Sequence, residues 1–308
     1  MRPVTEQTIR RAWAELLGVD ELGSGPRVLR WDDTAETVTF VRVFGRGVLT
    51  GPQWALDRAR NLSDDELSRL AVLLRLASDH GARPLGAAEL SYTDTRVEHA
   101  DLTTTQDEAA VAALEAACPD EDVDEVGLGG MPHRWVLLDG AGGDVAGEDG
   151  PAPLAGSGYV VWAEALAHMG VLTSPPARGR GYGVLAAAVG TNAALDAGLV
   201  PQWRARFDNE PSKRIAHVLG YELVGSQTTV FIDPPEDAHG GGRVGVELTL
   251  TSVDALLAVG APLAEDVGAG PPEVVAVGGP AGHRHHQRQR AALRDGPVAV
   301  AERGVGGH

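Results

Sequence analysis

Residues 175–190 read PPARGRGYGVLAAAVG, and the interpretation of the whole chain depends on this stretch. Two prolines and an arginine lead into Gly179, Gly181 and Gly183, and an alanine-rich run typical of a helix follows. Glycine and proline are common wherever a strand turns into a helix, so the stretch allows a simple turn. It equally allows an anion site, because the first N–H groups of a helix lack partners and glycines let a phosphate approach them.

The glycine spacing disfavours the two best-known nucleotide motifs. The pattern is not GxGxxG, since the third glycine comes one residue early, and no acidic residue follows about 20 positions later, as a Rossmann site requires. The pattern is not GxxxxGK[ST] either, which excludes a nucleotide P-loop. The apolar strand predicted at 170–173 nevertheless runs directly into the turn and the helix, which is the context that an anion-binding turn needs.

The composition favours a globular protein and allows cationic partners. The chain has 308 residues, of which 43% are hydrophobic and 22% are charged, a balance that fits about one to three domains. Its formal net charge of −17 disfavours nucleic acid and anionic membranes as partners. The same charge suits amines and other cations, although an acidic surface can also serve only to keep a protein in solution.

Cysteine usage and hydropathy favour a cytoplasmic location. The single cysteine, Cys118, excludes an internal disulfide and a cysteine-rich zinc site, and its apolar neighbours predict a buried thiol. Residues 1–17 have the pattern of an amphipathic helix and lack the apolar centre of a signal peptide. No apolar stretch is long enough to span a bilayer.

The first part of the chain, residues 1–94, is expected to form a small α/β segment. Its predicted elements are a helix, two strands and a second helix, over residues 5–17, 27–31, 37–49 and 63–81. Ser63 and Glu66 have the spacing of a capping box at the start of the second helix. This segment contains no visible catalytic constellation.

Residues 95–235 are expected to form an α/β layer around a mixed sheet. The predicted strands lie at 96–102, 134–140, 159–173, 200–207, 221–225 and 227–233, where 159–173 is one bent strand or a pair. The predicted helices lie at 103–118, with a threonine cap, and at 183–198 and 209–219. A glycine-rich connection with a flexible tip is expected at 140–158, and the acidic stretch at 120–130 is expected to be a solvated turn or short helix.

The last part of the chain, residues 236–308, is expected to be a flexible tail. It is rich in glycine, valine and alanine, and no aromatic residue follows Phe231, so little apolar surface is available to offset the entropy of ordering. The cluster formed by His283, His285 and His286 allows a metal site but is more typical of a solvated basic patch, because no carboxylate or cysteine lies close by. We therefore expect no metal.

Two motifs between residues 95 and 235 resemble the GNAT superfamily of acyl-CoA-dependent N-acetyltransferases. Arg178 to Gly183, RGRGYG, fits the family signature R/Q-x-x-G-x-G/A. Residues 209–221, NEPSKRIAHVLGY, resemble the later family segment N-x-x-S-x-R/K…L-G-F/Y, one helix and one strand further on. The resemblance implies an α/β (α+β) fold with a mixed, mostly antiparallel central sheet flanked by helices. It covers a little under half of the chain.

The resemblance also implies acetyl-CoA as a co-substrate and assigns residues to it. The pyrophosphate would lie on the turn made by Arg178, Gly179, Arg180, Gly181, Tyr182 and Gly183. The pantetheine arm would pair like an added strand with the backbone near Val171, Leu172 and Thr173, and would contact the segment of Asn209 and Ser212. An acceptor amine would then attack the thioester directly, without a covalent enzyme intermediate.

The catalytic groups follow less directly from the family pattern. Many members carry a tyrosine acid four residues before the glycine of L-G-F/Y, where this chain has Ala216. His168 and Glu164, near the strand before the motif, are the candidate bases, and each also has a purely structural interpretation. The function expected from these residues is acetyl transfer to a primary amine of a small molecule or peptide. The alternative is a non-catalytic acyl-CoA-binding module of the same fold.

The sequence leaves the assembly and the first segment open. A dimer is one alternative for the oligomeric state. The segment 1–94 could be a degenerate second copy of the same half-fold, although no repeat is visible in the sequence.

Overall fold

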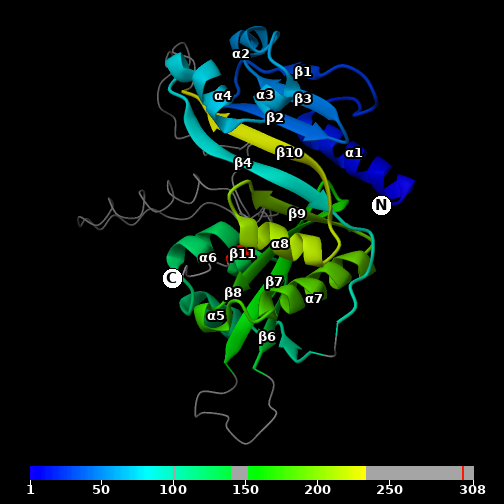
Figure 1. The fold of residues 1–308 in the computed structure, drawn as a ribbon, viewed down its shortest axis with the longest axis vertical. Coiled ribbons are helices and arrows are strands. Elements are labelled where there is room, and N and C mark those ends of the chain that lie inside the picture. The colour runs from blue at the N-terminus through cyan, green and yellow to red at the C-terminus, as the bar shows by residue number, and fades with distance from the viewer. Residues whose placement is uncertain (100–101, 140–151, 234–299, 302–308) are drawn as a thin grey trace, which may run out of the picture.

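One continuous sheet connects nearly all the elements of the computed structural model, which describes residues 1–99, 102–139, 152–233 and 300–301 (Figure 1). The described strands form an 11-stranded sheet in the order β1-β3-β2-β10-β4-β9-β8-β7-β6-β5, and β11 pairs with β8. Most neighbouring strands are antiparallel, and the parallel pairs are β1 with β3, β8 with β9 and β8 with β11. The expected mixed, mostly antiparallel sheet flanked by helices is confirmed.

The first part of the chain supplies four strands and the helices around them. These elements are α1 (Pro3–Leu17), β1 (Val28–Trp31), β2 (Thr37–Val43), β3 (Arg46–Gly51), α2 (Gln53–Arg58), α3 (Asp64–Leu67), α4 (Leu70–Leu76), the 3₁₀ turn η1 (Ser78–His80) and β4 (Arg83–Tyr92). The predicted strand at 37–49 is a hairpin, because Phe44 and Gly45 both adopt positive φ angles, of 48° and 75°, and reverse the chain.

The remaining elements carry the two motifs. They are β5 (Thr104–Thr105), α5 (Glu108–Ala116), α6 (Asp120–Val126), η2 (Leu128–Gly130), β6 (His133–Leu138), β7 (Pro153–Trp162), β8 (Leu166–Thr173), η3 (Pro175–Ala177), α7 (Tyr182–Asp196), β9 (Val200–Arg206), α8 (Glu210–Val218), β10 (Glu222–Phe231) and β11 (Val300–Ala301). The predicted pair at 221–225 and 227–233 is one strand, β10. The predicted strand at 96–102 is wrong for residues 96–99, which form no strand, and residues 100–101 lie outside the described part.

Strands from the two parts of the chain alternate at the middle of the sheet. β4, from the first part, lies between β9 and β10, and β10 in turn lies between β4 and β2. The sheet is therefore continuous across residue 94, and the division of the chain at that residue stays a prediction.

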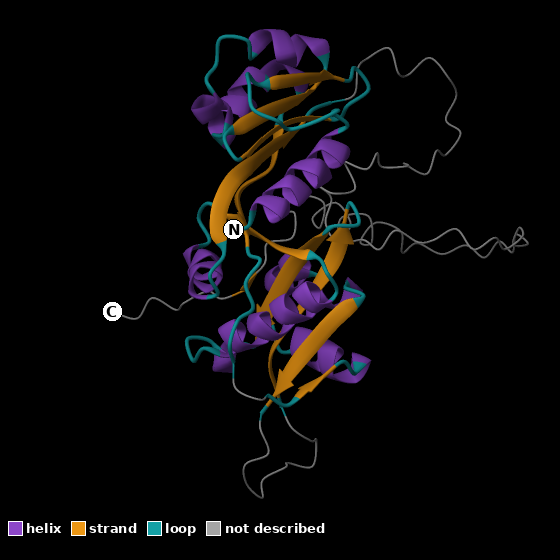
Figure 2. Cartoon of the chain, turned by 90° about the vertical axis from the view of Figure 1, so that its right-hand side faces the viewer, coloured by secondary structure: helices purple, strands orange, loops and turns teal. Residues whose placement is uncertain are grey.

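Helices cover both faces of this sheet (Figures 1 and 2). α2, α4, α7 and α8 pack on one face through two apolar clusters, which include Phe40 and Trp203. α1, α5 and α6 pack on the opposite face through two further clusters, which include Tyr92 and Leu172. Because strand residues alternate between faces, neighbours such as Val171 and Leu172 on β8 contact helices on opposite sides.

Tertiary contacts change two of the predicted helices. The capping box of Ser63 and Glu66 is confirmed, but α3 ends at Leu67 and α4 begins only at Leu70. The carbonyl of Ser68 between them accepts a 2.8 Å hydrogen bond from the Thr228 hydroxyl of β10. This carbonyl is therefore bonded to the sheet at the point where the predicted helix is interrupted. The predicted threonine cap of α5 is replaced by Asp107.

The glycine-rich connection predicted at 140–158 is partly a strand. β7 begins at Pro153, and residues 140–151 lie outside the described part. A Cβ on Gly156 would come within 2.7 Å of Leu128 Cδ2, and one on Gly158 within 2.6 Å of the His133 carbonyl. Neither glycine has room for a side chain, so both allow the neighbouring residues to pack closely against β7. Of the predicted tail, only 300–301 are described, so its flexibility and its histidine cluster stay predictions.

Candidate functional site

A slot opens between strands β8 and β9. β8 pairs with β7 along its whole length, from Leu166 to Thr173. It pairs with β9 only from Leu166 to His168, and the two strands have no further pairing beyond that point. The edge of β8 that includes Val171 and Leu172 is therefore open to an extended chain, here β11. The backbone predicted to hold the pantetheine arm lies along this edge.

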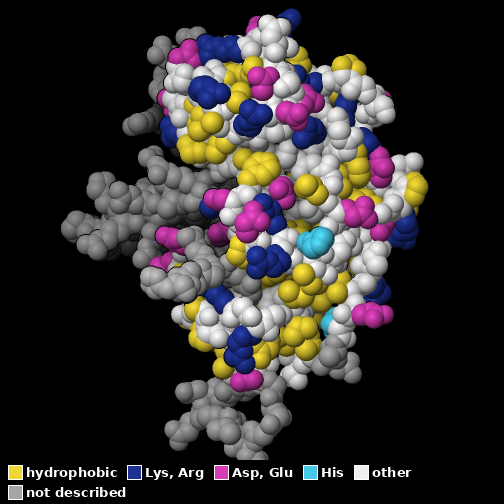
Figure 3. Space-filling view, viewed as in Figure 1, with side chains coloured by type: hydrophobic (Ala, Val, Ile, Leu, Met, Phe, Trp, Pro, Cys, Tyr) yellow, Lys and Arg dark blue, Asp and Glu magenta, His cyan; other side chains and the backbone are white. Residues whose placement is uncertain are grey.

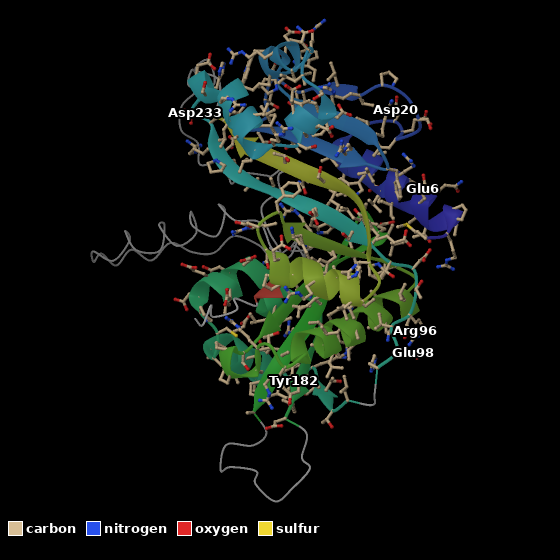
Figure 4. All side chains as sticks on the ribbon, viewed as in Figure 1. Glu6, Asp20, Arg96, Glu98, Tyr182 and Asp233 are labelled. Atoms are coloured by element: carbon tan, nitrogen blue, oxygen red, sulfur yellow. The ribbon has the colours of Figure 1, made fainter. Side chains whose placement is uncertain are left out.

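The glycine turn follows at the end of β8 and begins helix α7. Gly179 and Gly181 have φ angles of 70° and 87°, which explains why glycine is needed at both positions. Among the described residues, no heavy atom outside the adjoining chain lies within 4 Å of a Cβ placed on either glycine, so this part of the structure leaves the space in front of the turn open. Gly181 is the N-cap of α7, and none of the side chains that the structure describes caps this 15-residue helix. The first N–H groups of α7 are therefore suited to an anion. Figure 4 labels Tyr182 at this helix start.

The two arginines of the turn have different environments. The Arg178 guanidinium forms an ion pair with Asp122 at 2.7 Å and donates a 3.1 Å hydrogen bond to the Thr173 carbonyl. Its side chain is 13% exposed and that of Asp122 is 2% exposed, so this pair fastens α6 to the turn. Arg180 is exposed, and its guanidinium lies 5.1 Å from the ring centre of Tyr182. Of the two, Arg180 is the one placed to meet an anion from solvent.

Asn209 and Ser212 lie at the start of α8. The Asn209 side chain accepts a 3.0 Å hydrogen bond from the Ser212 backbone N–H and so caps the helix. Its amide nitrogen donates to Glu125 of α6 over 3.4 Å. The Ser212 hydroxyl is buried and accepts a 3.0 Å hydrogen bond from the Trp203 indole. Asn209 thus connects α6 and α8.

Two carboxylates of α6 that the sequence analysis assigned to a solvated stretch are buried. Asp122 is 2% exposed and Glu125 is 7% exposed. They are three residues apart, so they lie on the same side of the helix, facing the turn and β9. Glu125 favours the charged form of Arg204 on β9, although burial dominates and lowers the pKa of Arg204 to about 10. In the sequence, the only sign that these two acids could share a side of the helix was their spacing. Their arginine partners, which the sequence does not show, distinguish them from the exposed acids beside them.

His168 lies just before the slot, fully buried on the α1 face of the sheet. Its ring stacks on Trp162 with a centroid distance of 4.1 Å. The Gln202 amide lies 3.2 Å from Nδ1, and Gln202 in turn accepts a 2.7 Å hydrogen bond from the Tyr92 hydroxyl. The Trp13 indole donates to that hydroxyl over 2.6 Å. If the Gln202 amide donates to Nδ1, a neutral His168 carries its proton on Nε2.

Glu164 lies away from the open edge of β8, and Ala216 lies on α8. Glu164 is exposed at the tip of the β7–β8 hairpin with a φ of 53°, whereas the glycine turn follows the other end of β8. Ala216 is buried in the apolar cluster between α8 and the sheet. The structure therefore brings together the predicted cofactor residues, with His168 beside them and Glu164 at the far end of the strand.

A cavity of about 1000 Å³, which the sequence analysis did not predict, lies beside β9. It is bounded by the α3–α4 connection, β4, the end of β9 and the start of β10, and its lining includes Arg69, Glu89, Arg204, Phe207 and Leu223. Its walls carry both charges and apolar surface. The same mixture continues over the face shown in Figure 3, where acidic and basic side chains are interspersed.

Neither a metal cluster nor a membrane-spanning helix is found within the described ranges. No three histidine, cysteine, aspartate or glutamate side chains of these ranges are grouped as metal ligands. None of the described helices combines the length and the hydropathy needed to cross a bilayer.

A comparison with protein families confirms the resemblance inferred from the two motifs. The model of the GNAT acetyltransferase family matches residues 154–230, which run from β7 to β10 and include the slot, the glycine turn and the start of α8. The fold of this part of the chain is thus one that supports acyl transfer in general. No curated protein matches the chain.

Solved structures that match part of the chain include three GNAT proteins. A GNAT-family protein from Novosphingobium aromaticivorans is 18% identical, with a TM-score of 0.36 over 50% of this chain and 68% of its own. A GCN5-related N-acetyltransferase from Kribbella flavida is 21% identical, with a TM-score of 0.36 over 56% and 65%. A GNAT-family acetyltransferase from Colwellia psychrerythraea is 15% identical, with a TM-score of 0.37 over 52% and 60%. The matches thus span about two thirds or less of those chains.

Proposed function

We propose that this protein is an N-acyltransferase that transfers an acetyl group from acetyl-CoA to a primary amine. The observation that carries the proposal is the open start of α7, with its positive-φ glycines and no capping side chain, directly after a strand whose edge is unpaired by β9. A phosphate group fits the first feature, and an extended amide-bearing arm fits the second.

The residues of the site would bind and orient the co-substrate. The N–H groups at the start of α7, with Arg180 beside them, would hold the pyrophosphate, since the helix dipole and the arginine both favour negative charge. The backbone of Val171 and Leu172 would pair with the pantetheine arm. Asn209 would offer its amide to the same arm at the cost of its long contact with Glu125.

The chemical step would consist of direct attack by the amine on the thioester carbonyl. A new C–N bond forms, the C–S bond breaks, and coenzyme A leaves as a thiolate that takes up a proton. Backbone N–H groups at the slot would polarise the carbonyl, and a base must remove the proton of the amine. His168 is our candidate base because it lies next to the slot. To accept the proton at Nδ1, it would first have to lose the contact between Nδ1 and the Gln202 amide.

The acceptor is proposed to be a small or peptide amine that approaches beside β9. The cavity of about 1000 Å³ gives it room there, and Arg204 belongs both to β9 and to the cavity wall. Because the lining includes α3–α4, the first part of the chain would take part in selecting the acceptor.

A non-catalytic acyl-CoA-binding module is the second candidate. It is favoured by the position of Glu164 at the hairpin tip, by the burial of His168, and by Ala216 in the core where many family members carry a tyrosine acid. Binding of acyl-CoA without turnover is what this alternative expects.

Calorimetry with acetyl-CoA, followed by a thiol-release assay with a panel of diamines and peptide amines, tests both candidates. Binding together with amine-dependent release of coenzyme A supports the transferase. Binding without release for every amine supports the non-catalytic module. If acetyl-CoA does not bind, both candidates are excluded and the glycine stretch is a simple strand-to-helix turn.

A further inference from the structure

Strand β11, residues Val300–Ala301, occupies the slot itself. It pairs in parallel with β8, with Val300 opposite Val171 and Ala301 opposite Leu172. β7 already pairs with the other edge of these residues, through Ser157 opposite Val171 and Gly156 opposite Leu172. β11 must therefore lie on the edge of β8 that faces β9, in the gap where β9 no longer pairs with β8.

The helices on both sides of the slot also contact this strand. β11 lies against α6 on one face of the sheet and against α8 on the other (Figure 1). These are the helices that Glu125 and Asn209 connect at their facing ends. An extended backbone thus fills the space between β8, α6 and α8, which is the space that the proposed function gives to the pantetheine arm.

We propose that the C-terminal strand regulates the site by competing with the acyl-CoA arm for the open edge of β8. This inference rests on the proposed function, because it takes acyl-CoA as the second occupant. One strand edge offers a single row of N–H and C=O groups, so it can pair with β11 or with the amides of the arm but not with both. The state with β11 bound is closed to the co-substrate, and the state with β11 released is competent.

The effect on affinity depends on how often the slot is free. The apparent dissociation constant of a ligand rises in proportion as its competent state becomes less populated. A two-residue pairing gives only a modest bias toward the closed state, so we expect release of β11 to tighten acetyl-CoA binding by about threefold to tenfold. The regulation would therefore tune affinity rather than abolish it.

The test uses the full chain with two matched variants. The double substitution Val300→Pro with Ala301→Pro removes both backbone N–H donors of β11 and so prevents its pairing. The control, Val300→Ala, changes the same side chain and keeps both N–H groups. Calorimetry measures the dissociation constant for acetyl-CoA. Hydrogen exchange in the absence of ligand measures the protection of the Val171 amide, because its N–H points to the open edge of β8 whereas those of Gly170 and Leu172 point to β7.

The expected result is faster exchange at Val171 together with tighter acetyl-CoA binding in the proline variant, and neither change in the alanine control. Equal affinities in the wild type and the proline variant would overturn the inference while leaving the proposed function intact. Unchanged exchange would overturn it as well, because β11 would then not protect the edge. If no form of the protein binds acetyl-CoA, the proposed function fails and this inference fails with it.

Discussion

Replacing Gly181 with aspartate should abolish most acetyl-CoA binding while leaving the fold nearly as stable as before. Gly181 has a φ of 87° and caps α7, and the space in front of it is open. A left-handed conformation costs an L-residue about 1–2 kcal/mol. An aspartate at the start of a helix stabilises the folded state by about 0.5–2 kcal/mol through capping and the helix dipole. The two effects nearly cancel, so the free energy of unfolding should change by less than about 1 kcal/mol.

Binding should respond differently, because the new carboxylate would stand where a phosphate is expected. Two like charges about 5 Å apart repel by about 1–3 kcal/mol between the dielectric limits of water and of a protein surface. Since each 1.4 kcal/mol is a factor of about ten, the dissociation constant for acetyl-CoA should rise by about five- to 150-fold. Calorimetry gives the affinity, and thermal or urea unfolding followed by circular dichroism gives the stability.

Gly198 offers a matched control at the other end of the same helix. Its φ is 78°, and it too has open space around its Cβ position. Gly198→Asp adds the same strain and places the charge at the unfavourable end of the helix dipole, so it should destabilise the protein by about 1–3 kcal/mol. It should leave the affinity for acetyl-CoA unchanged. The anion-site reasoning is refuted if Gly181→Asp binds acetyl-CoA like the wild type, or if both variants lose binding equally.

Three further predictions test the surroundings of the site. Asp122→Ala should lower the free energy of unfolding by about 3–5 kcal/mol, because it leaves the largely buried charge of Arg178 without its carboxylate. A loss below about 1 kcal/mol in urea unfolding would contradict a stabilising role for this ion pair. Burial raises the pKa of Cys118 from 9.0 to about 11, so its thiolate fraction at pH 8 should be about 100-fold below that of the unfolded chain. Labelling of the folded protein by iodoacetamide as fast as the unfolded chain is labelled would disprove this. Its unfolded pKa is the lower one, so this thiol's contribution to stability should decline as the pH rises from about 9 toward 11. Tyr92→Phe removes the hydroxyl between Trp13 and Gln202 and should lower the unfolding free energy by about 1–3 kcal/mol, whereas an unchanged urea midpoint would show that this buried chain adds no stability.

Local sequence signals were sufficient for much of the site. The glycines of the turn, the apolar strand before it and the capping asparagine of α8 each act over a few residues, and each forms the local element in the structure. The capping box at Ser63 and Glu66 formed for the same reason, since both of its hydrogen bonds lie within four residues.

The sequence by itself thus determined the strand, turn and helix at residues 166–196, because backbone angles and helix ends depend on neighbours in the chain. Only the tertiary structure decided which charges are buried and which strands meet. Asp122 differs from the acids beside it only because Arg178 lies across from it, 56 residues later. β4 lies between β9 and β10 although it precedes both by more than 100 residues, and β11 reaches β8 across a similarly long stretch of chain. Such pairings depend on edges that exist only after the sheet has formed, so no local pattern of residues specifies them.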